Sequence, residues 1–306
     1  MRPERLLAAC ESALLRPEHA HVVALGVSDG TRRLVAGPDP DATGDVFSVT
    51  KSVTATAVRA ALADGVLASL DDPLTVLDRA PGVTVHRLLC MRQAWREDPD
   101  MDALAGTAAD PLPAIGAALA SGTAADGRPR YVNAAAHLLV RELDARTGSA
   151  AGYLSRRVLA PAGVGEHEWE RDATGAPWGH AHLHLGIADL LLLGETWAAA
   201  RPDLHPGTCA LGPPVAPEHL AYGGGFWHGE DVLLAAGWGG QCVLVHLPTG
   251  TVLAALTRTG WTRESGTDTL PSGWASGRRL FEEHALPLLR GSPAGHRPAD
   301  DERGTR

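Results

Sequence analysis

Residues 47–52 read Phe-Ser-Val-Thr-Lys-Ser and contain Lys51, the only lysine in a chain of 306 residues. Lysine and arginine together number 27, and the other 26 are arginine. Arginine keeps its proton because its pKa stays above about 12, whereas a buried lysine can become neutral and accept a proton from a nearby hydroxyl. We therefore predict that Lys51 is a chemical group of the protein rather than a surface charge.

The stretch from Ser48 to Ala68 is rich in alanine and in apolar residues at helical spacing, and Asp64-Gly65 supplies a helix stop. This pattern predicts a helix that begins at Ser48 and carries Lys51 one turn later on the same face. The N–H groups and the dipole at a helix N-terminus favour developing negative charge. Ser48 and Lys51 are therefore our candidate nucleophile and general base.

The rest of the chain predicts an α+β fold. Apolar runs bounded by turn residues are typical of strands and occur at residues 21–27, 33–37, 232–236, 241–246 and 251–256. Helical patterns occupy the N-terminus, most of residues 80–205, and residues 277–290. We expect an antiparallel sheet flanked by N- and C-terminal helices, with an inserted helical lobe and an active-site cleft between the lobes.

We predict a single catalytic domain over residues 1–290. Its sheet lobe covers about residues 1–47 and 207–290, and its helical lobe covers about residues 48–206. The polar and proline-containing residues 291–306 are predicted to form a disordered tail.

Composition narrows the class of protein. The chain is 44% hydrophobic and 21% charged with a formal net charge of −9, and this balance without a basic run argues against nucleic-acid binding. No stretch approaches the 18 or so uncharged apolar residues of a membrane helix, and the N-terminus lacks the regions of a signal peptide. The four scattered cysteines include no CxxC pair and are expected to be free, mostly buried thiols. These features predict a cytoplasmic protein.

Three motifs in order resemble those of the serine β-lactamase and penicillin-binding-protein superfamily, in its class C β-lactamase-like esterase branch. Residues 47–52 resemble its first motif, and Tyr131-Val132-Asn133 resembles the second, Tyr-x-Asn. Residues 235–241, Ala-Ala-Gly-Trp-Gly-Gly-Gln, lie where the third motif, Lys-Thr-Gly or His-x-Gly, is expected. The resemblance covers about residues 20–290, although the Ser-Gly pair expected near residue 92 is replaced by Arg-Gln-Ala-Trp.

The resemblance implies a role for each matching residue. Ser48 would attack a carbonyl and form an acyl-enzyme, with Lys51 as the neutral amine that takes its proton. Tyr131 would pass a proton to the leaving group, and Asn133 would hold Lys51 and the substrate. The oxyanion hole would consist of the backbone N–H groups of Ser48 and Trp238. The expected substrate-binding residues are Trp95, Gly237, Trp238 and Gly239.

The third motif departs from the family pattern, because no lysine or histidine precedes Gly237 to hold a substrate carboxylate. Its Gly-Trp-Gly-Gly-Gln sequence is similar to that of aminohexanoate-oligomer hydrolases and related esterases. We therefore expect a small ester or amide substrate, with water or an amine as acyl acceptor, and no cofactor. Two alternatives stay open: a true β-lactamase, and a non-catalytic member that binds ligands or partner proteins. The sequence contains no indication of an oligomeric state.

One further cluster has a competing interpretation. On a strand, His180, His182 and His184 would place three imidazoles on one face, which is a plausible zinc arrangement. No metal-binding motif such as H-E-x-x-H accompanies them. We therefore predict no metal site from the sequence.

Overall fold

A seven-stranded antiparallel sheet forms the centre of the computed structural model, which describes residues 1–77, 82–123, 130–200 and 220–291. The strand order is β2-β1-β12-β11-β10-β9-β8. The strands are β1 (Val22–Ser28), β2 (Arg33–Ala36), β8 (Ala221–Gly223), β9 (Phe226–His228), β10 (Val232–Ala236), β11 (Cys242–His246) and β12 (Thr251–Thr257). Pairing of β1 with β12 joins both ends of the chain in one sheet. The predicted α+β class and antiparallel sheet are thus confirmed.

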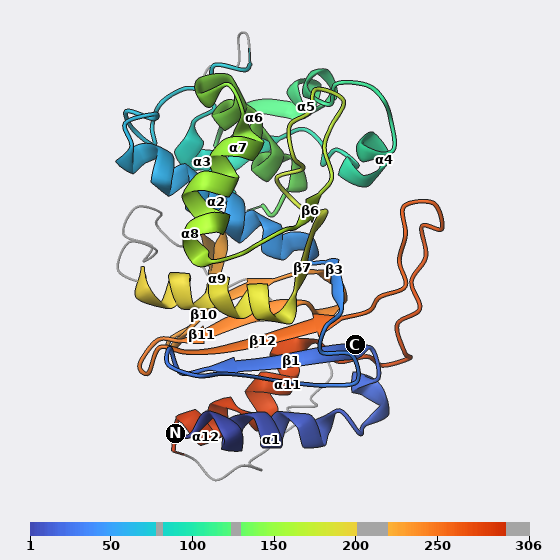
Figure 1. Cartoon of the computed structure of the whole chain (residues 1–306). Coiled ribbons are helices and arrows are strands. Elements are labelled where there is room, and N and C mark those ends of the chain that lie inside the picture. The colour runs from blue at the N-terminus through green and yellow to red at the C-terminus, as the bar shows by residue number, and fades with distance from the viewer. Residues whose placement is uncertain (78–81, 124–129, 201–219, 292–306) are drawn as a thin grey trace, which may run out of the picture.

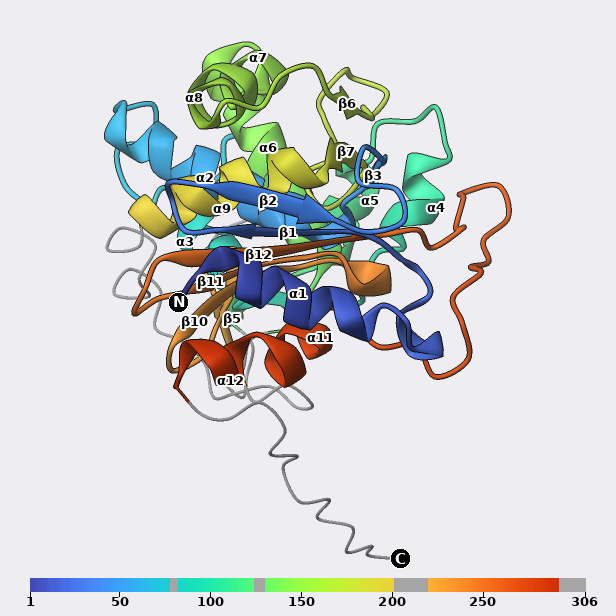
Figure 2. The ribbon, with the colours of Figure 1, turned by 60° about the horizontal axis from the view of Figure 1, so that its bottom comes forward.

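Helices cover both faces of this sheet (Figures 1 and 2). One face packs against α1 (Pro3–Ala13), α11 (Gly277–His284) and α12 (Leu286–Leu289), with Leu6 and Phe281 in its core. The other face packs against α9 (Ile187–Ala199), which the sequence assigned to the helical lobe. A Cβ on Gly194 of α9 would lie 2.3 Å from Val252 Cγ1, so glycine lets this helix lie close to the sheet.

A helical layer lies beyond α9 and carries the first two motifs. Its long members are α2 (Thr50–Ala63), which follows a 3₁₀ turn at Phe47–Val49, and α6 (Asn133–Thr147). The shorter helices of this layer are α3 (Val85–Leu89), α4 (Met101–Ala105), α5 (Leu112–Ala118), α7 (Ala150–Leu154), η3 (Ser155–Leu159) and α8 (Ala160–Ala162), whereas η1 (Pro17–His19) follows α1 on the other side of the sheet. Helix α2 ends just before Asp64-Gly65, as the sequence predicted.

Two small sheets and one hairpin were not predicted. One sheet has the order β3-β7-β6, from β3 (Thr43–Asp45), β7 (Leu183–Gly186) and β6 (Glu168–Trp169). The other pairs β4 (Gln93–Trp95) with β5 (Leu119–Thr123). The hairpin joins β8 to β9 through Gly224 and Gly225, whose positive φ angles suit a tight turn. The predicted tail lies outside the described residues, apart from Gly291.

The prediction of free cysteines is wrong for one residue. Cys10 and Cys242 are free and buried, but Cys90, at the end of α3, is disulfide-bonded. Sequence spacing did not reveal this bond because disulfide partners are close in space rather than in sequence. Disulfides persist mainly in oxidising compartments, so the cysteines no longer support a cytoplasmic location.

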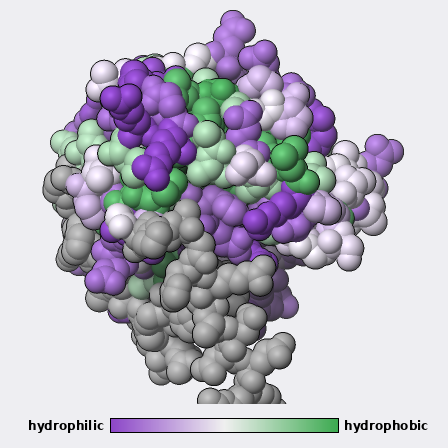
Figure 3. Space-filling view, turned by 90° about the horizontal axis from the view of Figure 1, so that it is seen from below, coloured by the Kyte–Doolittle hydropathy of each residue, from purple (hydrophilic) through white to green (hydrophobic). Residues whose placement is uncertain are grey.

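The hydropathy of the surface and the length of the helices bear on the sequence predictions. Figure 3 shows a face on which hydrophilic residues surround smaller hydrophobic patches. Among the described helices, none combines the length and the apolar character that a membrane crossing requires.

Candidate active site

The turn that carries Ser48 is fixed by Asp45, at the end of β3. Asp45 Oδ1 accepts hydrogen bonds from the backbone N–H of Phe47, at 2.7 Å, and of His182, at 2.9 Å. Phe47 has a φ of 46°, a conformation that is uncommon for a residue with a Cβ. Asp45 thus ties a strained turn just before Ser48 to the segment that leads into β7. The sequence analysis missed this residue, because its partner His182 is 137 positions away.

Lys51 lies directly beside Ser48. The distance from Lys51 Nζ to Ser48 Oγ is 2.6 Å, and Nζ also donates to the carbonyl oxygen of His180 at 3.0 Å. Only 2% of Lys51 is exposed. Burial lowers its pKa from 10.5 to about 7, against the opposing charges of Asp102 and Asp45. A large fraction of the amine is therefore neutral at neutral pH and able to accept a proton.

Tyr131 covers the other side of this pair. Its ring centroid is 4.9 Å from Lys51 Nζ, and the residue lines the same cavity as Ser48. Burial raises the pKa of the phenol to about 12, so the hydroxyl keeps its proton. Stacking on Trp227, with ring centroids 5.7 Å apart, holds the ring in place. Asn133 lines the same pocket, but among the described residues it is His180 rather than Asn133 that binds Lys51.

The third motif brings the end of β10 against the Ser48 turn. A Cβ on Gly237 would lie 2.3 Å from the carbonyl oxygen of Val46, so only glycine allows this close approach. The ring of Trp238 is 40% exposed and packs edge-on against Phe47, with centroids 5.3 Å apart. Gly239 has a φ of 73°, and its carbonyl accepts a hydrogen bond from a threonine of β12. Gly237 and Gly239 shape the backbone, whereas Trp238 also lines the pocket.

A cavity of about 460 Å³ opens above Ser48. Its lining consists of Phe47, Ser48, Asp98, Asp102, Tyr131, Asn133, His180, Ala181, Trp238, Trp261, Gly266 and Asp268. Three of these side chains are carboxylic acids, and none of these described lining residues is lysine or arginine. Burial raises the pKa of Asp98, which favours its neutral form more than in water. The lining is thus poorly suited to a substrate that carries its own carboxylate.

Trp95 was expected to bind substrate, but it does not line this cavity. It is 7% exposed and lies in β4, where its carbonyl oxygen accepts a hydrogen bond from Arg130 at 3.1 Å. Trp261, from the long segment between β12 and α11, lines the cavity instead. Aromatic residues in the core and around a pocket look alike in sequence, so the sequence analysis could not separate Trp95 from Trp261.

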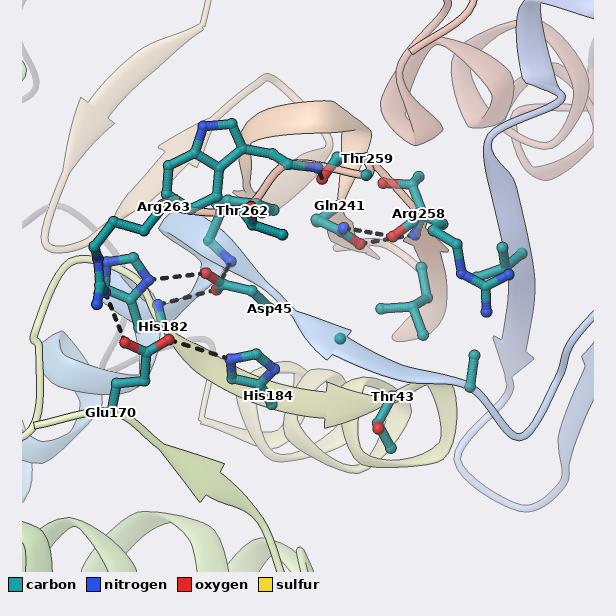
Figure 4. A pocket seen from close by; sticks show the side chains of 18 residues that line it. Thr43, Asp45, Glu170, His182, His184, Gln241, Arg258, Thr259, Thr262 and Arg263 are labelled. Carbon is teal, nitrogen blue, oxygen red and sulfur yellow. Dashed lines mark hydrogen bonds and ion pairs between the residues drawn. The ribbon is translucent and has the colours of Figure 1, made fainter. Parts of the chain in front are cut away.

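The three histidines near β7 do not share a face, contrary to the expectation for a single strand. His180 lines the Ser48 cavity, and burial lowers its pKa to about 3. His182 Nδ1 lies 3.1 Å from Asp45 Oδ2, and His184 Nε2 lies 3.8 Å from Glu170 (Figure 4). The reason is that the strand begins only at residue 183 and that His182 has a φ of 65°.

A second cavity of about 440 Å³ adjoins the first and shares Phe47 and Trp261 with it. Figure 4 shows its polar side chains, among them Asp45, His182 and His184. One wall comes from residues 256–263, at the end of β12 and the start of the long segment that follows. The ion pair of Arg263 with Glu170, at 2.6 Å, connects that segment to the small β3-β7-β6 sheet.

An antiparallel sheet covered by helices, with Ser48 and Lys51 at the start of α2, defines a β-lactamase-like protein. The family model described as Beta-lactamase matches residues 7–279, so the chain belongs to this family. The resemblance to the serine β-lactamase and penicillin-binding-protein superfamily is thereby confirmed. No curated protein matches the sequence.

Solved structures share the fold at low sequence identity. A D-stereospecific amidohydrolase from Streptomyces sp. is 18% identical, with a TM-score of 0.64 over 93% of this chain and 99% of that chain. A Bacillus anthracis protein assigned to the 6-aminohexanoate-dimer hydrolases is 15% identical, with a TM-score of 0.67 over 89% of this chain and 81% of that one. EstCE1, a hydrolase with promiscuous acyltransferase activity, is 16% identical, with a TM-score of 0.66 over 90% and 96% of the two chains.

Proposed function

We propose that this protein is a serine hydrolase or acyltransferase that forms an acyl-enzyme on Ser48 from a small ester or amide. The observation that carries this proposal is the 2.6 Å contact between Ser48 Oγ and a buried Lys51 amine whose pKa is lowered to about 7. A neutral amine in hydrogen-bond reach of a hydroxyl can act as its general base.

The first half-reaction uses groups that already lie together. Lys51 Nζ takes the Ser48 proton as Oγ attacks the substrate carbonyl, and a tetrahedral intermediate forms. Tyr131, which lines the same cavity as Ser48 and is still protonated, donates a proton to the leaving alcohol or amine as the carbonyl re-forms. Lys51, now protonated, returns a proton to Tyr131.

The oxyanion would be held by the backbone N–H groups of Ser48 and Trp238. The close approach of Gly237 to Val46 supports this assignment, because it fixes the backbone of Trp238 beside the Ser48 turn. Donors held in place before the reaction stabilise developing charge without reorganisation, and losing one typically slows the reaction about 100- to 1,000-fold.

The substrate class follows from the pocket. The three carboxylic acids of the lining and the missing cation of the third motif disfavour the carboxylate of a β-lactam, and they favour an uncharged or cationic acyl group. The names of the amidohydrolase and of the acyltransferase-active hydrolase above agree with amide or ester chemistry, with water or an amine as acceptor. A true β-lactamase has less support.

Burst kinetics with p-nitrophenyl acetate test the proposal. The wild-type protein should release one equivalent of nitrophenol rapidly and gain the mass of one acetyl group, whereas Ser48→Ala should show neither change. A selective enzyme could be slow with acetate, so p-nitrophenyl butyrate and an alanine nitroanilide belong in the same series. If no acyl group labels Ser48, the non-catalytic binding protein becomes the better interpretation.

A further inference from the structure

Asp102, His180 and His182 bring three possible metal-ligand atoms within 4.8 Å of one another, beside the Ser48 cavity. Nε2 of His182 lies 3.7 Å and Nε2 of His180 lies 4.0 Å from Asp102 Oδ1. Both distances are too long for hydrogen bonds. Asp102 belongs to α4, and the two histidines belong to the segment before β7. Asp102 is therefore separated from each histidine by at least 78 positions in the sequence.

The two imidazoles are buried without sufficient partners. His180 and His182 are each 1% exposed, and neither Nε2 atom has a hydrogen-bond partner among the described residues. Buried polar atoms are nearly always hydrogen-bonded, so atoms that are not bonded need an explanation. A bound metal ion, which accepts the lone pairs of both Nε2 atoms, would explain why these atoms have no hydrogen-bond partner.

His182 is also oriented as metal-bound histidines usually are. Its Nδ1 lies 3.1 Å from a carboxylate oxygen of Asp45, which can only accept a hydrogen bond, so Nδ1 carries the proton. The lone pair is then on Nε2, which faces Asp102. A carboxylate that fixes the far nitrogen of a ligand histidine is the usual outer partner of a zinc site. The φ of 65° at His182 is a backbone conformation that is uncommon for a residue with a Cβ and that occurs often at functional sites.

The two distances to Asp102 suit a small ion after a modest contraction, and the three ligand atoms all lie within 4.8 Å of one another. Ligand atoms 2.0–2.1 Å from a tetrahedral zinc ion lie about 3.4 Å from one another. The observed 3.7 and 4.0 Å are a few tenths of an ångström longer. The side chain of Asp102 is 53% exposed, so it is free to make this adjustment.

We propose that Asp102, His180 and His182 form a binding site for a divalent first-row transition metal ion such as Zn²⁺. Two histidines, one carboxylate and an open position form a donor set that proteins use for such ions. Asp102 and His180 line the cavity of Ser48, so the open position takes water or a substrate oxygen from that cavity. The site does not depend on acyl-enzyme formation.

Metal titration of the full chain without a histidine tag tests the site. After extraction with a chelator, the wild-type protein should bind one equivalent of Zn²⁺ in calorimetry, and one equivalent of Co²⁺ should give the intense visible absorption of a tetrahedral site. Asp102→Asn should weaken this binding by at least about 100-fold, since loss of outer partners alone costs 10- to 100-fold. Asp102 is exposed, so this variant is expected to fold.

Two further variants make the result specific. Asp98→Asn removes a carboxyl group from the same cavity but no proposed ligand, so its Zn²⁺ affinity should match the wild type. Ser48→Ala should also keep the metal while losing any acyl-enzyme, which separates the two proposals. The metal proposal is overturned if the wild type binds no equivalent of either ion, or if Asp102→Asn and the wild type bind equally well.

Discussion

Replacement of Lys51 by methionine should make the folded protein more stable at neutral pH. The pKa of Lys51 falls from 10.5 to about 7 on folding, because the charged amine loses its hydration. Each tenfold change in proton affinity is worth about 1.4 kcal/mol, so the burial of this amine costs about 4 to 5 kcal/mol at pH 7. Methionine has a similar length and no charge. Methionine cannot form the two hydrogen bonds of Nζ, each of which stabilises the folded protein by about 1 kcal/mol. We expect a net gain of about 2 to 3 kcal/mol.

The sign of the pH dependence follows from the lowered pKa. The unfolded chain binds more protons at Lys51 than the folded chain between about pH 7 and 10.5, so the stability of the wild type rises with pH in this window. From pH 7 to about 9.5 the rise due to Lys51 is about 3 kcal/mol, and the Lys51→Met protein lacks it. The two proteins should therefore reach similar stability near pH 9.5.

Equilibrium urea unfolding at both pH values measures this difference. The comparison between wild type and Lys51→Met cancels the contributions of titrating groups that both proteins share. Ser48→Ala retains Lys51 and should show the same pH dependence as the wild type. The reasoning is refuted if Lys51→Met is no more stable than the wild type at pH 7, or if its extra stability is the same at pH 9.5 as at pH 7. Either result would mean that Lys51 has an ordinary pKa in the folded protein.

Two other substitutions test the site in kinetic assays. Tyr131→Phe should slow acylation of Ser48 about 100- to 10,000-fold in rapid-quench experiments, while its melting temperature stays close to that of the wild type because the ring stack with Trp227 persists; an unchanged rate would remove Tyr131 from the mechanism. Gly237→Ala should slow acylation by at least about 100-fold, since its Cβ would displace the backbone of Val46 or of Trp238. Gly165→Ala, where a Cβ meets open space, is the matched control, and equal rates for the two alanine variants would contradict the close approach at Gly237.

Sequence patterns were sufficient where the determining interactions are local. Strands β10, β11 and β12 are continuous apolar runs with clear turns between them, and their predicted positions agree with the structure to within about one residue. Ser48 and Lys51 are one helical turn apart, so the formation of α2 alone brings their side chains together. For this reason the part of the site that lies on α2 was predictable.

The remaining parts of the site depend on contacts between distant segments. Asp45, His182 and Asp102 meet only after β3 pairs with β7 and after α4 lies beside them. None of these residues belongs to a motif of its own, and the His180-Ala181-His182 pattern suggested a strand that begins only afterwards. The position of Trp95 outside the cavity lining and the disulfide bond of Cys90 were not foreseen for a related reason, since burial and disulfide pairing are properties of the tertiary fold.

The pH dependence of Ser48 acylation tests the central claim most directly, because it reports on the base and the nucleophile together. Stopped-flow bursts with p-nitrophenyl acetate, with the labelled peptide mapped by mass spectrometry, should give a rate that rises about tenfold per pH unit below about pH 7 and then levels off. The acetyl group should be on the peptide that contains Ser48, and Lys51→Met should show no burst. A rate that is constant through pH 7, or an acetyl group on another residue, would contradict the account.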